Sequence, residues 1–182
     1  MKHAVGAGSF LIASPTLRDP NFARTVVLLC EHGEAGSMGI VINRPSEVTL
    51  GDAIQGLEDA PSEPLFVGGP VQPNAVLILH RGAVVPDARE VADDIAIGGD
   101  ETDLLALLRT PRSAAVRVYS GYAGWGAGQL DGELAEGSWL IGTAQAPLVF
   151  DCDPASVWSA AVRTLGPKFA YLIDLPLDPR VN

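Results

Sequence analysis

The chain has 182 residues, of which 47% are hydrophobic, and its formal net charge is −10. This length and composition predict one folded globular domain and exclude a disordered chain. Nucleic acids are bound mainly through Lys and Arg, and here acidic residues outnumber basic ones by 22 to 12, so we do not expect direct nucleic-acid binding. The sequence has neither an apolar run of membrane-spanning length nor a secretory h-region at its start, which predicts a cytoplasmic protein that stays out of the membrane.

The first half of the chain predicts short strands and one short helix. In chain order, the expected elements are strands at Ser9–Ser14, Thr25–Glu31 and Ser37–Asn43, a helix at Leu50–Leu57, and strands at Leu65–Val67 and Val76–His80. The turn residues of His32–Gly36 join the second and third strands into a hairpin. Thr49 is the expected N-cap of the helix, and residues 58–64 form a linker.

The second half mixes further short strands with helices. In chain order, we expect a strand at Ile95–Ile97, helix Glu101–Arg109, strand Val116–Ser120, helix Gln129–Glu136, strands at Trp139–Ile141 and Val149–Phe150, and a helix from Pro154 to Leu165. Asp153 is the expected N-cap of this last helix. The proline-containing tail, residues 168–182, is expected to be loosely held. Because no regular alternation of strand and helix appears, the pattern predicts a single α+β domain over residues 1–182.

Residues 119–130 hold four glycines and three aromatic side chains in twelve positions. Gly126 and Gly128 match the first two glycines of a dinucleotide-binding loop, between an expected strand and an expected helix. However, Asp131 and Glu133 already complement the positive end of that short helix and would repel a pyrophosphate. We therefore expect a tight strand-to-helix corner packed by aromatic side chains, with no bound cofactor.

Several stretches of the chain, taken together, resemble the bacterial YqgE/AlgH family. The matching stretches are Ser14–Thr25, Cys30–His32, Gly39–Pro45, Gly68–Val71 and Gly121–Leu130, with Glu133 and Trp139 beyond them. They lie in order and span roughly residues 8–166. The resemblance implies a single α+β domain with a coiled, irregular, mixed or antiparallel sheet and short flanking helices, and no settled activity. Some family members carry the label of transcriptional regulator, which the acidic charge of this chain does not support as direct DNA contact.

Cys30 and His32 are two residues apart, which in a regular strand places both side chains on one face. A thiolate–imidazole pair or two metal ligands can be built in that way, but no third group is apparent. A buried Cys beside a turn His is the simpler interpretation. Ser37 lies in a near match to the nucleophile elbow, but a strand follows it where the elbow requires a helix. We assign no catalytic residue and no metal site.

The hairpin register points to a different kind of site. If residues 32–36 form the loop, Thr25 faces Asn43 and Arg24 faces Arg44. Like charges directly opposite each other are destabilising unless something neutralises them. One hypothesis is that Arg24, Arg44 and Asn43 line a site for an anionic or carboxylate-bearing ligand. The alternative is that the arginines hold an acidic side chain of the chain itself, such as Asp19.

The sequence therefore predicts a non-enzymatic regulatory or ligand-binding module, with an unidentified protein or small molecule as partner and self-association as a further possibility. The candidate ligand-binding residues are Arg24, Asn43, Arg44, Gly68, Gly69, Tyr122, Trp125, Gly126, Gln129 and Glu133. The paired glycines either cradle an anion through their backbone or mark a strand bend. The alternative function is an enzyme of unknown reaction that uses Glu133 or the Cys30/His32 pair as acid–base or thiol groups.

Overall fold

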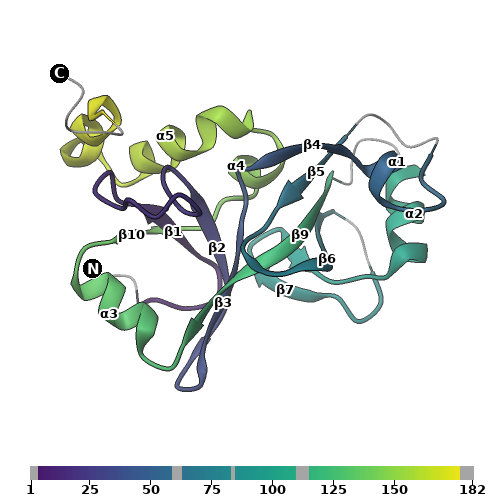
Figure 1. Cartoon of the computed structure of the whole chain (residues 1–182), viewed down its shortest axis with the longest axis horizontal. Helices are drawn as coiled ribbons and strands as arrows, with labels where there is room; N and C mark the ends of the chain where they lie inside the picture. The colour runs from purple at the N-terminus through teal and green to yellow at the C-terminus, as the bar shows by residue number, and fades with distance from the viewer. Residues whose placement is uncertain (1–3, 59–62, 83–84, 110–114, 177–182) are drawn as a thin grey trace.

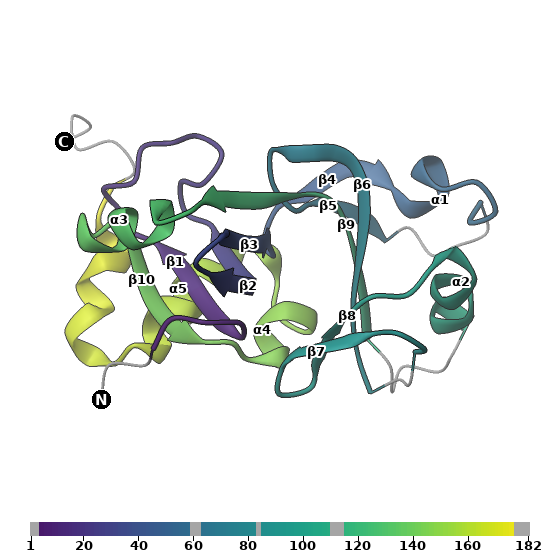
Figure 2. The same cartoon turned by 90° about the horizontal axis from the view of Figure 1, so that it is seen from below.

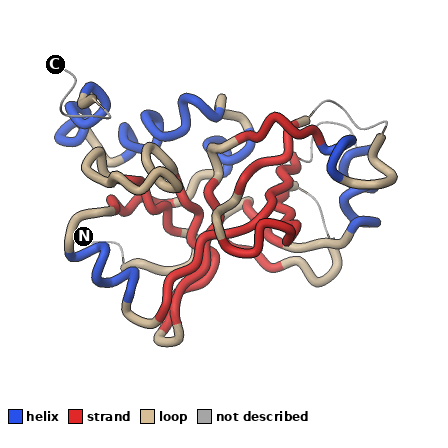
Figure 3. Tube along the Cα trace, viewed as in Figure 1, coloured by secondary structure: helices blue, strands red, loops and turns tan. Residues whose placement is uncertain are grey.

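A computed structural model describes residues 4–58, 63–82, 85–109 and 115–176 of the chain. Within these residues the strands form one curled sheet of ten strands, in which antiparallel pairs predominate. Figure 3 shows the strands running through the middle of the molecule, with helices at its two ends and along one side. The α+β class and the irregular mixed sheet with short helices, both expected from the sequence, are confirmed.

One half of the sheet consists of four antiparallel strands. They are β1 (Ser9–Ala13), β2 (Val26–Gly33), β3 (Gly36–Val41) and β10 (Trp139–Thr143), in the order β10-β1-β2-β3. In β1, Phe10 and Ile12 face one apolar cluster, while Leu11 and Ala13 face another. Helices α4 (Ala146–Phe150) and α5 (Pro154–Thr164) contribute to the first cluster, and α3 (Gln129–Ala135) contributes to the second. Because both faces are covered, β1 and most of β2 are continuous apolar runs.

The other half of the sheet has one face covered by two helices. Its strands are β4 (Pro45–Thr49), β5 (Pro64–Val67), β6 (Val71–Arg81), β7 (Arg89–Ala92) and β8 (Ile95–Ile97). Figure 1 shows α1 (Leu50–Ala53) and α2 (Glu101–Arg109) together at this end of the molecule. Leu50 of α1 and Leu104 of α2 pack on Ile78 of β6 in a third apolar cluster.

A single long strand, β9 (Ala115–Gly126), joins the two halves. Its first part lies between β5 and β6, with Tyr119 opposite Phe66 on one side and Leu77 on the other. Its last residues pair with β3, where Gly126 lies opposite Gly36. Figure 2 shows β9 passing from one half of the sheet into the other. The predicted strand ended at Ser120, and the following glycine–aromatic segment, expected to be a loop, is mostly the continuation of this strand.

The glycines at the junction allow two backbones to approach closely. The backbone N–H of Gly68 donates to the Ser120 carbonyl at 2.9 Å, and the Val41 N–H donates to the Gly68 carbonyl at 2.8 Å. A Cβ atom added at Gly69, whose φ is +152°, would lie 2.2 Å from the Tyr122 carbonyl carbon. A Cβ atom at Gly121 would lie 2.5 Å from the Gly69 carbonyl oxygen. The absence of side chains at these glycines therefore allows the two backbones to cross.

The β2–β3 hairpin contains a bulge that the sequence did not predict. Its far end has the expected register, with Leu29 opposite Gly39, but beyond Cys30 the register shifts by one residue and Ser37 lies opposite His32. The expected five-residue loop is correspondingly short, because β2 extends to Gly33 and β3 begins at Gly36. An extra residue in one strand reverses which face the following side chains occupy.

Some other expected elements differ from the observed ones, mainly where the hydrophobic pattern was too short to define an element. Val149–Phe150, expected to be a strand, ends the short helix α4, which carries Pro147 in its first turn. The helix capped by Thr49 ends at Ala53, short of Leu57. Strands β4 and β7 were not expected at all, since neither has a run of apolar residues. The start of the tail is ordered as the 3-10 helix η1 (Pro167–Asp174), which buries Leu172.

We expect Gly69→Ala to lower the free energy of unfolding by about 2–5 kcal/mol, because it combines a strained φ with an overlap against fixed backbone. Urea unfolding monitored by circular dichroism measures this loss. Gly132→Ala is the matched control, since a Cβ at this helical position meets nothing within 4 Å. The control should be neutral or stabilising by up to about 1 kcal/mol. Equal stability of the two variants would contradict the close approach of β5 and β9.

Candidate functional site

The ten candidate residues lie in three parts of the structure. Gly68, Gly69 and Tyr122 belong to the strand crossing described above. A second group at the start of α3 is joined by hydrogen bonds and consists of Trp125, Gly126, Gln129 and Glu133. A third group follows the loop before β2 and the end of β3, and consists of Arg24, Asn43 and Arg44.

Glu133 is the centre of the second group. Its Oε2 accepts hydrogen bonds from the indole Nε1 of Trp125 at 2.9 Å and of Trp139 at 2.8 Å. Its Oε1 accepts from the side-chain amide of Gln129 at 3.0 Å, and the Gln129 carbonyl oxygen in turn accepts from the backbone N–H of Gly126. Three donors to one carboxylate form a charge-assisted network that holds two buried tryptophans in place. Glu133 therefore has a structural role in this network.

The two tryptophans hold the loop that precedes β2. Their rings lie 6.1 Å apart in an edge-on arrangement. Phe22 stacks on Trp125 at 6.2 Å and meets Trp139 edge-on at 5.6 Å. Such aromatic pairs fix side-chain orientation as well as burying area. Phe22 is two residues before Arg24, so the Glu133 network also positions the third group.

Arg24 does not lie opposite Arg44, because the chain turns out of the strand before that point. Arg24 has φ +57°, a left-handed conformation uncommon for a residue with a side chain. Asn43 fixes this turn in both directions: its Nδ2 donates to the Arg24 carbonyl and its Oδ1 accepts from the Val26 N–H, each at 3.0 Å. The predicted facing of the two arginines is therefore wrong, whereas the predicted proximity of Asn43 to Arg24 is confirmed.

The two arginine side chains have different surroundings. The guanidinium of Arg24 lies 4.0 Å from the ring centroid of Trp158 and donates to the Leu175 carbonyl. The guanidinium of Arg44 donates to the Ala23 carbonyl at 3.1 Å. Burial lowers the pKa of both, and for Arg44 the charge of Asp19 opposes this effect. Arg44 thus has the internal carboxylate neighbour that the sequence offered as one alternative.

A groove of about 580 Å³ runs beside Arg24, between the start of α5 and η1. The lining residues are Arg24, Asn43, Pro154, Ala155, Trp158, Ser159 and Ile173. In the part of the chain that the structure describes, the ion pairs are formed by His32, Arg81, Arg89 and Arg117, so Arg24 faces this groove without a carboxylate partner. Trp158 was not among the predicted site residues, since a Trp on the apolar face of a helix has the same pattern as a core residue.

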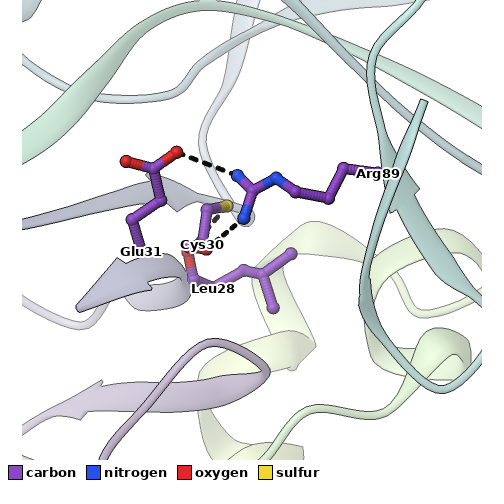
Figure 4. Close-up of polar contacts among 4 residues, drawn as sticks. All are labelled: Leu28, Cys30, Glu31 and Arg89. Atoms are coloured by element: carbon purple, nitrogen blue, oxygen red, sulfur yellow. Dashed lines mark hydrogen bonds and ion pairs between the residues drawn. The ribbon is translucent and has the colours of Figure 1, made fainter. Parts of the chain in front are cut away.

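The bulge separates the thiol from the imidazole. Cys30 belongs to the same apolar cluster as Leu28, whereas His32 lies opposite Ser37 on the other face, and its Nδ1 is 2.8 Å from the Ser37 Oγ. The predicted placement of Cys30 and His32 on one face is therefore wrong. The bulge also frees the Cys30 carbonyl, which accepts from Arg89 at 3.0 Å, while Glu31 accepts from the same guanidinium at 3.0 Å (Figure 4).

Burial makes Cys30 a poor nucleophile. The side chain has no exposed surface, its Sγ donates to the Leu28 carbonyl at 3.5 Å, and desolvation raises the pKa of the thiol to about 12. Among the described residues, no group of three His, Cys, Asp or Glu side chains is arranged to hold a metal ion. Over the same residues, no helix has the length and apolarity needed to cross a bilayer.

The fold and the site together define a single-domain α+β protein with a curled sheet and a groove beside α5. The profile of the AlgH-like family matches residues 10–170. The chain therefore belongs to the AlgH-like family, as its sequence motifs indicated.

Relatives and solved structures agree with this assignment. A UPF0301 protein of Chlorobaculum tepidum is 43% identical over 96% of this chain and 95% of its own length. Another from Magnetococcus marinus is 40% identical over 96% of each. The solution structure of the AlgH protein from Pseudomonas aeruginosa superposes with a TM-score of 0.74, at 35% identity, over 97% of this chain and 98% of that chain. The crystal structure of a protein from Corynebacterium diphtheriae shares the fold, with a TM-score of 0.80 at 23% identity over 94% and 93%.

We expect Glu133→Gln to lower the free energy of unfolding by about 1.5–3 kcal/mol, because an amide accepts through one oxygen and presents donors to the indoles. Urea unfolding followed by tryptophan fluorescence measures the loss. The control is Glu136→Gln, which makes the same change at an exposed position of the C-cap of α3. If the two variants are equally stable, Glu133 does not hold the tryptophans.

We expect Cys30 to resist thiol reagents in the folded protein and to react on unfolding, whereas the partly exposed Cys152 reacts in both states. The stability that Cys30 contributes is fully present below its unfolded pKa of 9.0 and is lost as pH rises toward about 12, since the unfolded thiol ionises first. Ellman titration tests the reactivity. Urea unfolding of wild type and Cys30→Ala across this alkaline range tests the pH dependence. If the difference in their free energies of unfolding does not narrow as the pH rises, this prediction is wrong.

Proposed function

We propose that this protein is a non-enzymatic binding protein whose groove beside α5 takes a small, largely apolar molecule carrying one carboxylate. The observation that carries this proposal is the guanidinium of Arg24, which is partly buried, stacked on Trp158, and faces the groove without a carboxylate partner among the described residues. An arginine of this kind is suited to bidentate carboxylate recognition.

The chemistry of the groove supports this ligand class. Trp158, Pro154 and Ile173 supply apolar surface, and among the described lining residues Arg24 is the one that carries a charge. A volume of about 580 Å³ is in the range of small-molecule sites. One cation and an apolar wall favour a monoanion with a hydrocarbon or aromatic body over a polyanion.

The backbone around Arg24 supports a binding role as well. A residue other than glycine in a left-handed conformation costs about 1–3 kcal/mol and is retained where the surroundings hold it for a purpose. Here Asn43 holds the turn through two hydrogen bonds, and the turn presents the guanidinium to Trp158. The strained backbone is thus coupled to the placement of the Arg24 guanidinium in the groove.

The enzymatic alternative has less support. Glu133 is occupied by three hydrogen-bond donors, and Cys30 and His32 point to opposite faces of the sheet. A regulatory role fits a protein that responds to a ligand, and the charge of −10 makes a protein partner a better recipient of that response than DNA. We place this activity in the cytoplasm.

The proposal is tested by thermal unfolding with octanoate and with its uncharged analogue octanamide. At about ten times the dissociation constant, a ligand adds roughly 1.4 kcal/mol, which raises Tm by about 3–6 °C for a chain of this size. We expect this rise with octanoate only, and its loss in Arg24→Gln.

Arg18→Gln is the matched control, since Arg18 is exposed and does not line the groove. It should keep the wild-type shift. A panel extended to benzoate and indole-3-acetate tests aromatic bodies in the same way. Equal shifts in Arg24→Gln and wild type, or no shift with any carboxylate of the panel, would overturn the proposed function.

A further inference from the structure

His80, near the end of β6, is a buried side chain whose polar atoms have no partner. It is 1% exposed, and neither Nδ1 nor Nε2 makes a hydrogen bond. A buried donor or acceptor without a partner costs about 1–3 kcal/mol, so native proteins rarely leave one without a reason. Nothing in the proposed function uses this residue, and its strand β6 belongs to the half of the sheet at the α1 and α2 end of the molecule (Figure 1).

A second cavity, of about 490 Å³, lies on the face of the sheet that carries His80. The register places His80 opposite Ala96 and Ala96 opposite Glu90, so these three side chains share one face of β6, β8 and β7. All three line the cavity, and Asp93 and Asp94 of the turn between β7 and β8 line it as well. His80 is therefore one of the wall residues of an acidic cavity, with both ring nitrogens buried behind its surface.

The charged residues around this cavity are mostly acidic. The carboxylates of Glu90, Asp93 and Asp94 line it, and from α2 the charge of Asp103 also acts on His80. Among the described lining residues, Arg81 is the one cation, and its guanidinium lies 2.5 Å from Asp151. Burial lowers the pKa of His80, so the imidazole is neutral near pH 7 and has one nitrogen free to accept a hydrogen bond.

We propose that this cavity binds a small organic cation with N–H donors, of the aliphatic diamine class, which donates to the His80 imidazole while the carboxylates of Glu90, Asp93 and Asp94 balance its charge. The ligand supplies the missing partner of a buried nitrogen and places its cationic groups where the carboxylates gather. The site is separate from the Arg24 groove and takes a ligand of the opposite charge.

The probe is putrescine, titrated into the full chain at about physiological ionic strength so that loose surface attraction is screened. The ring-proton resonances of His80, identified by their absence in His80→Leu, report binding by NMR. We expect a saturable shift of these resonances. Butanediol, which has the same length without the charges, should cause none.

Two variants test the recognition. His80→Leu should weaken putrescine binding, measured by calorimetry, by about tenfold through loss of the acceptor. Its Tm should equal or exceed that of wild type, because it removes unpartnered polar atoms. Glu90→Gln should weaken binding about threefold, as expected for an exposed charge, whereas Glu47→Gln, the same change at an exposed site on β4, should leave it unchanged.

Some results would overturn the proposal. They are a shift that does not saturate, equal affinity in wild type and His80→Leu, equal weakening by Glu90→Gln and Glu47→Gln, or binding of butanediol. A fall in Tm for His80→Leu without loss of affinity would assign the imidazole a purely structural role. Octanoate binding in the Arg24 groove is measured separately in the same variants, so failure of one site is distinguishable from failure of the other.

Discussion

The pairing of β9 with three different strands is the constraint on which the structure depends. The strand lies between β5 and β6 at one end and beside β3 at the other. For β9 to pair with all three strands, the residues that follow β5 must lie very close to the β9 backbone. At this distance there is no room for a Cβ atom at Gly68, Gly69 or Gly121. The glycine–aromatic segment therefore has a structural role. Its glycines allow the backbones to cross, and the aromatic side chains between them pack into the apolar clusters on both sides.

In the half of the sheet formed by β10, β1, β2 and β3, the carboxylate of Glu133 is the group that fixes the arrangement of its neighbours. By fixing Trp125 and Trp139 it fixes Phe22, and through Phe22 the loop that ends at Arg24. A residue with the appearance of a catalytic acid thus acts as a support for a groove to which it does not contribute. The proposed carboxylate site and its scaffold are linked by ring contacts, so the position of Arg24 is set from two directions, by Phe22 and by Asn43.

The fold class, most strands and the helices at Glu101–Arg109 and after Asp153 were predictable from the sequence, because capping residues and apolar runs are local signals. The bulge at Cys30 was not, since an extra residue in a strand leaves no mark in the hydrophobic pattern, and its omission placed the thiol and His32 together. The hairpin register led to Asn43 and Arg24 as candidate residues, although the charge repulsion expected from Arg24 facing Arg44 does not occur. Trp158 and His80 depend on contacts between distant segments, and a single sequence does not contain these.

Arginine side chains recur in this structure as links between distant backbones. Arg89 reaches the Cys30 carbonyl, Arg117 the Phe150 carbonyl, Arg44 the Ala23 carbonyl and Arg24 the Leu175 carbonyl. Arg89 and Arg117 each hold a carboxylate at the same time, Glu31 and Glu63. A carbonyl dipole is neutral, so dissolved ions weaken the carboxylate contacts of these links more than the backbone contacts. A lysine ammonium cannot reproduce these contacts, because it lacks the planar guanidinium that donates to two partners at once. The use of arginine therefore makes these contacts between distant segments less sensitive to ionic strength.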